Sequence, residues 1–327
     1  MACKKISLLQ TARFLKRNDH FVILTHASPD GDTLGSACAL AMGLQKIGKR
    51  TYVICPDPVP KKFDYFMKKL RNRAFKYKNI IAVDIADEAL LGSLKDEFGG
   101  KVNLCIDHHV SNTGYAENLF LDASASATAE CIFAILKVIH AVIDDNMAAA
   151  LYTGISTDTG CFKYSNVTAR TFDIAGKLFA YNINAAEINR IMFDTKSKNR
   201  LELERMVFDT AEFHFDEKCM ILSVTEEIQK KTKCSGSELE GVAAISRSVE
   251  GVLAGVTIKE SEKNVFKISL RTYEPLDAAN ICGRLGGGGH RAAAGCTVNG
   301  TLDEVKEKIL ASVKQELEEA NAGAYTD

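Results

Sequence analysis

Short apolar runs alternate with helical periods in the first part of the chain. Four runs rich in β-branched residues are separated by stretches whose apolar positions recur every three or four residues. The predicted strands are FVILT (21–25), TYVIC (51–55), NIIAVD (79–84) and KVNLCID (101–107), and the predicted helices lie near 33–48, 61–70 and 88–98. After residue 125 the pattern is mostly helical. This order of elements predicts an α/β domain with a parallel sheet flanked by helices.

The pattern changes near residue 190, which predicts a second domain. A polar segment, DTKSKNRLELERMVFD (194–209), is typical of a charged helix or linker. The strand-like runs FHF, CMILSV, GVLAGVTIKE and NVFKISLRTY follow, and a helical pattern covers 303–320. We therefore expect a larger domain over 1–190, a helical linker over 191–212 and a smaller α+β domain over 213–327.

Composition narrows the functional classes. The chain has 327 residues, enough for about two domains, and 41 Lys plus Arg against 42 Asp plus Glu. This balance gives no global basic field, so we expect no long nucleic acid as a partner. Ten cysteines without a C-x-x-C pair favour a reducing, cytoplasmic location. The sequence contains no stretch of about 18 apolar residues, so no membrane span is predicted.

Acidic and imidazole side chains follow the predicted strands. Ligands of open parallel sheets gather at the carboxyl ends of the strands, so these positions are candidates for a site. One further aspartate lies in a loop bounded by glycines, GISTDTG, after a predicted helix. The candidates are His26, Asp30 and Asp32 after the first strand, Asp84 after the third, Asp107, His108 and His109 after the fourth, and Asp158 in the loop.

This mixture of donors predicts a metal site, although each motif alone has a simpler interpretation. Asp30-Gly31-Asp32 alone is typical of a turn, which Gly31 would keep tight, Asp84 could cap a helix, and His108 or His109 could be an ordinary hydrogen-bonded histidine. Their joint occurrence at successive strand ends favours metal binding. Carboxylate and imidazole ligands suit Mn²⁺ or a similar ion. Two such ions about 3.5–4 Å apart would predict chemistry on a phosphoester.

These motifs resemble those of the DHH family of phosphoesterases, and the likeness covers nearly the whole chain. In order, they are His26-Ala-Ser-Pro-Asp30-Gly-Asp32, Asp84, Asp107-His108-His109-Val-Ser-Asn112 and Thr157-Asp158-Thr159-Gly160. The resemblance implies that His26, Asp30 and Asp84 hold one metal ion, and that Asp32, Asp84, His108 and Asp158 hold the other.

The same resemblance implies roles for the residues beside these ligands. Asp107 is expected to orient a histidine ligand, as metal sites commonly require. His109 is expected to face the substrate as a catalytic residue, and Asn112 is counted among the substrate-binding residues. The attacking group is expected to be water activated by the two ions, so no protein nucleophile is needed.

The segment SLRTYEPLDAANICGRLGGGGHRAAAGC (269–296) resembles the DHH-associated domain that accompanies this catalytic unit. Gly286, Gly287, Gly288 and Gly289 would let backbone amides approach an anion, and His290 and Arg271 could contact phosphate or base. A flexible glycine linker is the alternative interpretation of GGGG. The resemblance implies an active site in the cleft between the two domains.

Within the family, the chain is most similar to the NrnA-like branch of bifunctional oligoribonucleases. This branch implies hydrolysis of short RNA (nanoRNA) and of 3′-phosphoadenosine 5′-phosphate (pAp). The alternatives are a phosphodiesterase acting on c-di-AMP or a linear dinucleotide, and a non-catalytic nucleotide sensor. A pyrophosphatase of the related manganese type is disfavoured by the GGGGH segment. The sequence is compatible with a homodimer.

Overall fold

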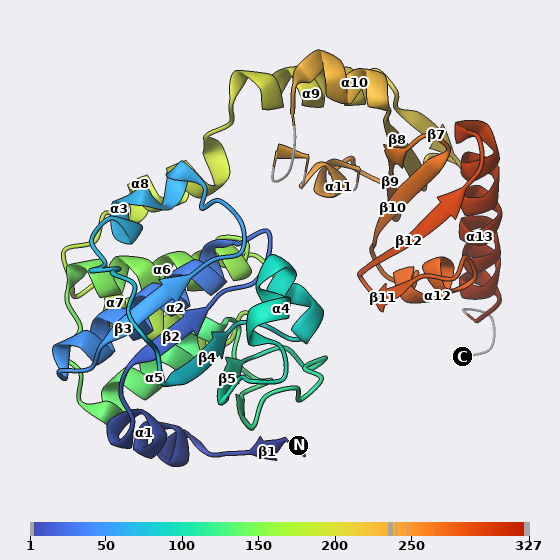
Figure 1. Ribbon diagram of the computed structural model, residues 1–327. Coiled ribbons are helices and arrows are strands. Elements are labelled where there is room, and N and C mark those ends of the chain that lie inside the picture. Colours follow the sequence, from blue (N-terminus) through green and yellow to red (C-terminus); the bar gives the residue numbers. More distant parts are fainter. Residues whose placement is uncertain (1–2, 235–237, 240, 247, 324–327) are drawn as a thin grey trace. The chain divides into compact units, whose positions relative to one another are not determined.

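The structure, a computed structural model, describes residues 3–234, 238–239, 241–246 and 248–323 (Figure 1). The chain divides into two compact units, Met1–Thr195 and Lys196–Asp327. This boundary lies inside the segment 191–212. The expectation that the active site lies in a cleft between the units stays a prediction.

A parallel sheet of six strands forms the centre of the N-terminal unit, in the order β1-β6-β5-β4-β2-β3. Every pair of neighbours in it is parallel. The predicted α/β class is therefore confirmed. The strands are β1 (Lys4–Lys5), β2 (Phe21–Leu24), β3 (Thr51–Ile54), β4 (Asn79–Val83), β5 (Leu104–Asp107) and β6 (Asn118–Leu121).

Helices cover both faces of this sheet, because the strands are apolar on both sides (Figure 1). One face packs with α1, α2, α5 and α6, and the other with the shorter segment η2–α4. The helical elements are α1 (Leu8–Arg17), α2 (Gly31–Lys46), η1 (Lys61–Phe63), α3 (Asp64–Met67), η2 (Glu88–Leu94), α4 (Lys95–Phe98), α5 (Thr128–Ile139), α6 (Asp145–Asp158), α7 (Ala169–Leu178), α8 (Ala185–Asn189) and η3 (Arg190–Asp194).

Two details of the sequence prediction were wrong. The stretches 61–70 and 88–98 each form a 3₁₀ turn followed by a single helical turn, rather than one helix. In the second, Gly92 has a φ of 53°, which breaks the helical path. The short strands β1 and β6 were not predicted, because pairing and not a long apolar run places them in the sheet: β6 pairs with β5, and β1 pairs with β6.

A mixed sheet forms the C-terminal unit, in the order β11-β12-β10-β9-β8-β7, with β8 and β9 parallel and the other neighbours antiparallel. The strands are β7 (Glu212–His214), β8 (Cys219–Val224), β9 (Ala254–Glu262), β10 (Val265–Thr272), β11 (Gly288–His290) and β12 (Ala293–Asn299). The helices are α9 (Lys198–Phe208), α10 (Glu226–Thr232), α11 (Val242–Ile245), α12 (Ala278–Gly283) and α13 (Leu302–Gly323). Among the helices of the described residues, none is long and apolar enough to cross a membrane.

Candidate metal centre

The strand order explains why acidic groups from distant parts of the sequence meet at one edge of the sheet. Strand β4 lies between β2 and β5, so Asp84 follows the middle strand of the three. His26 follows β2 on one side, and His108 follows β5 on the other. A side chain placed after the central strand can reach both neighbours. Asp84 therefore lies where two groups of ligands could share it.

The first group of donors consists of His26, Asp30 and Asp84. The Nε2 atom of His26 lies 3.6 Å from Asp30 Oδ1 and 3.8 Å from Asp84 Oδ2. Its Nδ1 atom lies 2.8 Å from the carbonyl oxygen of Ala27, which turns Nε2 toward the two carboxylates. These distances leave room for a cation between the three side chains, because each ligand atom would lie about 2.0–2.2 Å from a bound transition metal ion.

The second group consists of Asp32, His108 and Asp158. The Nε2 atom of His108 lies 3.5 Å from Asp158 Oδ2 and 3.8 Å from Asp84 Oδ1. The Nδ1 atom of His108 lies 3.1 Å from the carbonyl oxygen of Ala125, which fixes the ring. The structure thus brings together all six residues that the sequence resemblance names as ligands, in two groups on either side of Asp84.

Burial makes this cluster of carboxylates unfavourable without a cation. Asp32 is 1% exposed and Asp84 is 3% exposed. Burial, with the neighbouring Asp84, raises the pKa of Asp32 to about 8, and burial with Asp30 nearby raises the pKa of Asp84 to about 7. The Nε2 atom of His108 is buried without a hydrogen-bond partner among the described residues. An unpaired imidazole nitrogen facing crowded carboxylates is the donor set that a divalent cation satisfies.

The N-terminus of helix α5 holds two of the carboxylates in place. The backbone amides of Thr128 and Ala129 donate to the two oxygens of Asp32, at 2.6 and 2.9 Å, and the Thr128 hydroxyl donates to Asp84 Oδ1 at 2.7 Å. Thr128 was not among the site residues predicted from the sequence. The only available signal was that the α5 N-cap residue, Ala127, has no side chain able to cap the helix, so the caps come from Asp32 instead.

Two local predictions in the aspartate motifs were wrong. The segment Asp30-Gly31-Asp32 is not a turn, because Asp30 is the N-cap of α2 and accepts hydrogen bonds from the amides of Asp32 and Thr33. Gly31 is needed for close packing, since a Cβ there would overlap the side chain of Thr157. Asp158 is the last residue of α6 rather than part of a loop.

Asp107 and Asn112 form a hydrogen-bonded support for His109. Asp107 Oδ1 accepts from His109 Nδ1 at 2.8 Å, and its Oδ2 accepts from the amide of Asn112 at 2.6 Å. This hydrogen bond to Asp107 raises the pKa of His109 to about 9. The His109 side chain is 43% exposed, and its Nε2 atom is left for a ligand. Asp107 therefore contacts the ring of His109, whereas its contact with the ligand candidate His108 is to the backbone amide, at 2.7 Å.

Comparison with known proteins decides the family. Residues 20–155 match the model of the DHH family, N-terminal domain, and residues 216–319 match the DHHA1 domain. A protein of Thermus thermophilus described as bifunctional oligoribonuclease and PAP phosphatase NrnA is 33% identical over 307 residues, which cover 91% of this chain and 90% of the relative. The chain belongs to the DHH family.

Other proteins are similar along most of this chain. The Bacillus subtilis bifunctional oligoribonuclease and PAP phosphatase NrnA is 25% identical, over 92% of this chain and 96% of the relative. The crystal structure of an exopolyphosphatase-related protein from Bacteroides fragilis superposes with a TM-score of 0.82 at 25% identity, covering 95% of each chain. RecJ of Thermus thermophilus, solved in complex with Mn²⁺, shares the fold with a TM-score of 0.55 at 16% identity, over 94% of this chain and 55% of RecJ.

The contacts of Asn112 in this DHH-family chain bear on its expected role in substrate binding, which stays a prediction. Its Nδ2 atom donates to Asp107 and to the carbonyl oxygen of Ile85, and its Oδ1 accepts from the amide of Gly114. Both ends of the amide are therefore occupied by the protein. This geometry favours a positioning role, in which Asn112 holds the carboxylate that orients His109.

Replacing Asn112 tests this positioning role. Asn112→Ala should lower kcat by about 10–100-fold, because such supporting hydrogen bonds typically contribute this much, while Mn²⁺ binding stays close to that of the unmodified protein. Steady-state kinetics and calorimetric Mn²⁺ titration measure the two quantities. Asn79→Ala, which removes an amide bonded to the carbonyl oxygen of Asp19, is the control and should retain activity. A rise in KM with unchanged kcat would instead support direct substrate contact.

The DHHA1 unit carries the second set of predicted residues. The GGGGH segment is not a flexible linker, since Gly288–His290 forms the edge strand β11. A Cβ on Gly287 would overlap Cys296, and one on Gly289 would overlap Ala294, so these two glycines allow close packing on β12. Gly286 has a φ of 77°, whereas a Cβ on Gly288 would meet nothing within 4 Å.

His290 and Arg271 lie in one row across this sheet. Both are registered opposite Ala293 of β12, one from β11 and one from β10. Residues directly opposite one another in an antiparallel pair point to the same face. The two basic side chains therefore share a face, with the small Ala293 between them.

Replacing His290 tests whether this row binds substrate. His290→Ala should raise KM for nucleotides by about tenfold and change kcat little, because it removes one hydrogen bond to a charged group, and the fold does not depend on this exposed side chain. The control is His214→Ala at the opposite edge strand, β7, where KM should not change. Equal KM values for the two variants would remove His290 from the substrate site.

Proposed function

We propose that this chain is a metal-dependent phosphoesterase that hydrolyses short oligoribonucleotides to nucleoside monophosphates and removes a phosphate from pAp. One observation carries the proposal: Asp84, after the central strand, lies 3.8 Å from both His26 and His108, which belong to two neighbouring groups of carboxylate and imidazole donors. Relatives that match nearly the whole chain are named for these two activities. The proposed domains are a catalytic DHH domain over 1–190, a linker over 191–212 and a substrate-binding DHHA1 domain over 213–327.

The proposed metal site holds two divalent ions, with Mn²⁺ as the preferred metal. His26, Asp30 and Asp84 would hold one ion, and Asp32, Asp84, His108 and Asp158 the other. The mixture of oxygen and imidazole donors without thiolate suits Mn²⁺. Each carboxylate oxygen that already accepts an amide hydrogen has a further lone pair for a ligand bond. When bound, the two ions would supply electrophilic stabilisation of the phosphoryl group and lower the pKa of water.

The protein's own residues position and protonate the substrate in this scheme. The hydrogen bond to Asp107 raises the pKa of His109, which favours a proton on the nitrogen that faces away from Asp107; His109 could donate this proton to a phosphoryl oxygen or to the leaving group. Asp107 accepts hydrogen bonds from the backbone amide and the ring of His109, which limits rotation of the imidazole. Arg271, His290 and the exposed backbone of Gly286–Gly289 would bind the phosphate or base of the nucleotide.

A substrate panel tests the proposed function. Purified protein with Mn²⁺ should release AMP and phosphate from pAp, and nucleoside monophosphates from RNA of two to five nucleotides, whereas chelation with EDTA should stop both reactions. Long RNA, c-di-AMP and pyrophosphate belong in the same panel. Preference for c-di-AMP would replace the proposal with a cyclic dinucleotide phosphodiesterase. Nucleotide binding without turnover of any substrate would indicate a sensor.

A further inference from the structure

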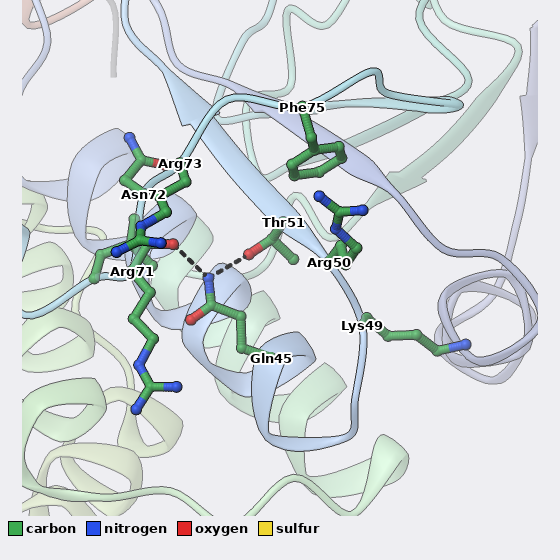
Figure 2. A pocket seen from close by; sticks show the side chains of 9 residues that line it. Gln45, Lys49, Arg50, Thr51, Arg71, Asn72, Arg73 and Phe75 are labelled. Carbon is green, nitrogen blue, oxygen red and sulfur yellow. Dashed lines mark hydrogen bonds between the residues drawn. The ribbon is translucent and has the colours of Figure 1, made fainter.

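A basic hollow lies at the amino end of the parallel sheet, away from the metal centre. It has a volume of about 680 Å³ and is lined by Lys49, Arg50, Arg71 and Arg73, together with polar residues and Phe75 (Figure 2). Lys49 and Arg50 immediately precede strand β3, whereas the metal ligands follow the carboxyl ends of β2, β4 and β5. Since all strands are parallel, the length of the strands, about 3.3 Å per residue, separates the two sites.

The local charge of this region differs from that of the whole chain. The segment KKLRNRAFKYK (68–78) contains six basic residues and no acidic residue, whereas the full chain has a net charge of −1. The remaining residues therefore carry a net charge of −1 − 6 = −7. The near-neutral total hides a concentrated positive surface, which attracts anions locally.

Two side chains hold the basic segment against the sheet. Asn72 pairs with the backbone of Val53 in β3, accepting from its amide at 2.8 Å and donating to its carbonyl oxygen at 2.9 Å. The amide of Gln45 donates to the carbonyl oxygen of Arg71 and to the hydroxyl of Thr51, as the dashed lines in Figure 2 show. The backbone at Arg71 and the side chain of Asn72 are therefore held against the sheet, which lowers the entropic cost of placing Arg71 against a ligand.

Two of the four positive charges that line the hollow have no carboxylate beside them in the described part of the chain. Among the described residues, Arg71 and Arg73 have no acidic partner within 4.0 Å. The acidic residue close to Lys49 and Arg50 is Asp19, whose carboxylate accepts the backbone amides of Arg50 and His20. A phosphate group would supply the missing counter-charge, and arginine binds phosphate through paired hydrogen bonds.

The basic surface extends beyond a single phosphate site. A second hollow of about 570 Å³ shares Gln45, Lys49 and Arg71 with the first and adds Lys46 and Lys69. In this second hollow, the ammonium of Lys46 forms an ion pair with Asp144, with 2.8 Å between Nζ and Oδ2. The cations that line the two hollows, Lys46, Lys49, Arg50, Lys69, Arg71 and Arg73, are called the basic strip; they fit a chain of successive phosphates better than an isolated phosphate ion.

An aromatic ring lies at one end of the first hollow. The guanidinium of Arg50 lies over Phe75, with 4.7 Å between its carbon and the ring centroid. An arginine guanidinium beside an aromatic ring can offer a planar cationic surface on which a base can stack. Cationic side chains that contact the phosphate backbone, next to a surface on which bases stack, are characteristic of proteins that bind single-stranded nucleic acid.

We propose that this basic strip is a second RNA-binding site, which holds the phosphate backbone of single-stranded RNA without hydrolysing it. The ligand class follows from Arg71 and Arg73, which have no acidic partner among the described residues, from the cations that line two adjoining hollows, and from the contact of Arg50 with Phe75. This site extends the range of partners beyond the short nucleotides expected from net charge. It does not depend on the proposed function, because it shares no residue with the metal centre.

Fluorescence anisotropy with two labelled RNA probes, a 12-nucleotide strand and a dinucleotide, tests the site. The full chain is kept in EDTA to prevent hydrolysis. Arg71→Glu combined with Arg73→Glu should raise the Kd of the longer RNA roughly tenfold and flatten the slope of log K against log salt by about 1.4, as expected for two lost phosphate contacts. The control, Lys230→Glu with Lys231→Glu on exposed α10, makes the same charge change and should leave the Kd within about twofold.

The remaining arms separate this proposal from its alternatives. The dinucleotide should bind equally to both variants and to the unmodified protein, and its hydrolysis with Mn²⁺ should be unchanged, which keeps the test independent of catalysis. An equal loss of affinity for the longer RNA in both variants, or no loss of affinity in either, would overturn the proposal. ATP that displaces the longer RNA from the unmodified protein, and whose own binding is lost in the Arg71/Arg73 variant, would assign the hollow to a free nucleotide instead.

Discussion

Asp84→Ala should abolish hydrolysis of every substrate, with kcat/KM falling by at least about a thousandfold. Asp84 follows the central strand and lies within reach of both donor groups, so its loss would disturb both proposed ions at once. A metal ion contributes several kcal/mol to stabilising the charge that develops on the phosphoryl group, and about 4 kcal/mol corresponds to a thousandfold in rate. Steady-state kinetics with pAp and a dinucleotide measure the loss.

The isosteric variant Asp84→Asn separates this effect from misfolding. Burial and Asp30 raise the pKa of Asp84 to about 7 in the folded chain without metal. A carboxyl group with a raised folded pKa destabilises the fold at any pH above its unfolded pKa of about 3.9, because ionisation is then more costly in the folded state. Asp84→Asn should therefore have a metal-free Tm no lower than that of the unmodified protein, and Mn²⁺ should no longer raise it.

The matched control for Asp84 is Asp173→Asn. Asp173 is an exposed aspartate that pairs with Lys177 one helical turn away. Such surface pairs contribute little to stability, so activity and the Mn²⁺-dependent rise in Tm should both persist. Near-normal turnover in Asp84→Ala would require abandoning the shared ligand and with it the two-metal scheme.

His109→Ala should lower kcat by about 10²–10⁴-fold while leaving Mn²⁺ affinity almost unchanged. That loss is typical of removing a general acid or base. The ring of His109 is held by Asp107 through Nδ1, and the side chain is 43% exposed, whereas that of His108 is 11% exposed and faces Asp84 and Asp158. The two adjacent histidines should therefore behave differently.

His108→Ala is the comparison for this experiment. It should weaken Mn²⁺ binding, measured by calorimetric titration, and lower activity in a way that added Mn²⁺ partly restores. His109→Ala should show lost turnover at every Mn²⁺ concentration. If His109→Ala weakened Mn²⁺ binding as strongly as His108→Ala, His109 would be a metal ligand. Its Nδ1 atom lies 3.6 Å from Asp84 Oδ1, which is close enough for the two atoms to share an ion.

The sequence was most informative where a single element carries the information. Runs such as FVILT and NIIAVD are short, β-branched and bounded by polar residues, and they form β2 and β4 close to the predicted limits. The sheet rule then predicted that residues after parallel strands meet at one edge. The distances from His26 and His108 to Asp84 agree with that rule.

The contacts of residues that act through other residues could not be predicted in this way. Thr128 donates a hydrogen bond to Asp84, which lies 44 positions away in the chain. Asn112 lies in a family motif, but its side-chain amide donates to Asp107. Neither contact has a periodicity or spacing that a sequence pattern could show. Gly31 likewise looked like a turn residue, because its packing against Thr157 of another helix leaves no trace in the surrounding residues.

The sequence by itself determined the α/β class, the change of pattern near residue 190 and the identity of the donor residues, since these depend on local periodicity and on the chemistry of side chains. Only the tertiary structure decided that β4 lies between β2 and β5, which places Asp84, assigned to both ions by the resemblance, 3.8 Å from both His26 and His108. It also decided that Arg71 and Arg73 join Lys49 and Arg50 around one hollow. Strand order and surface shape come from packing between elements that lie far apart in the chain, which local patterns do not encode.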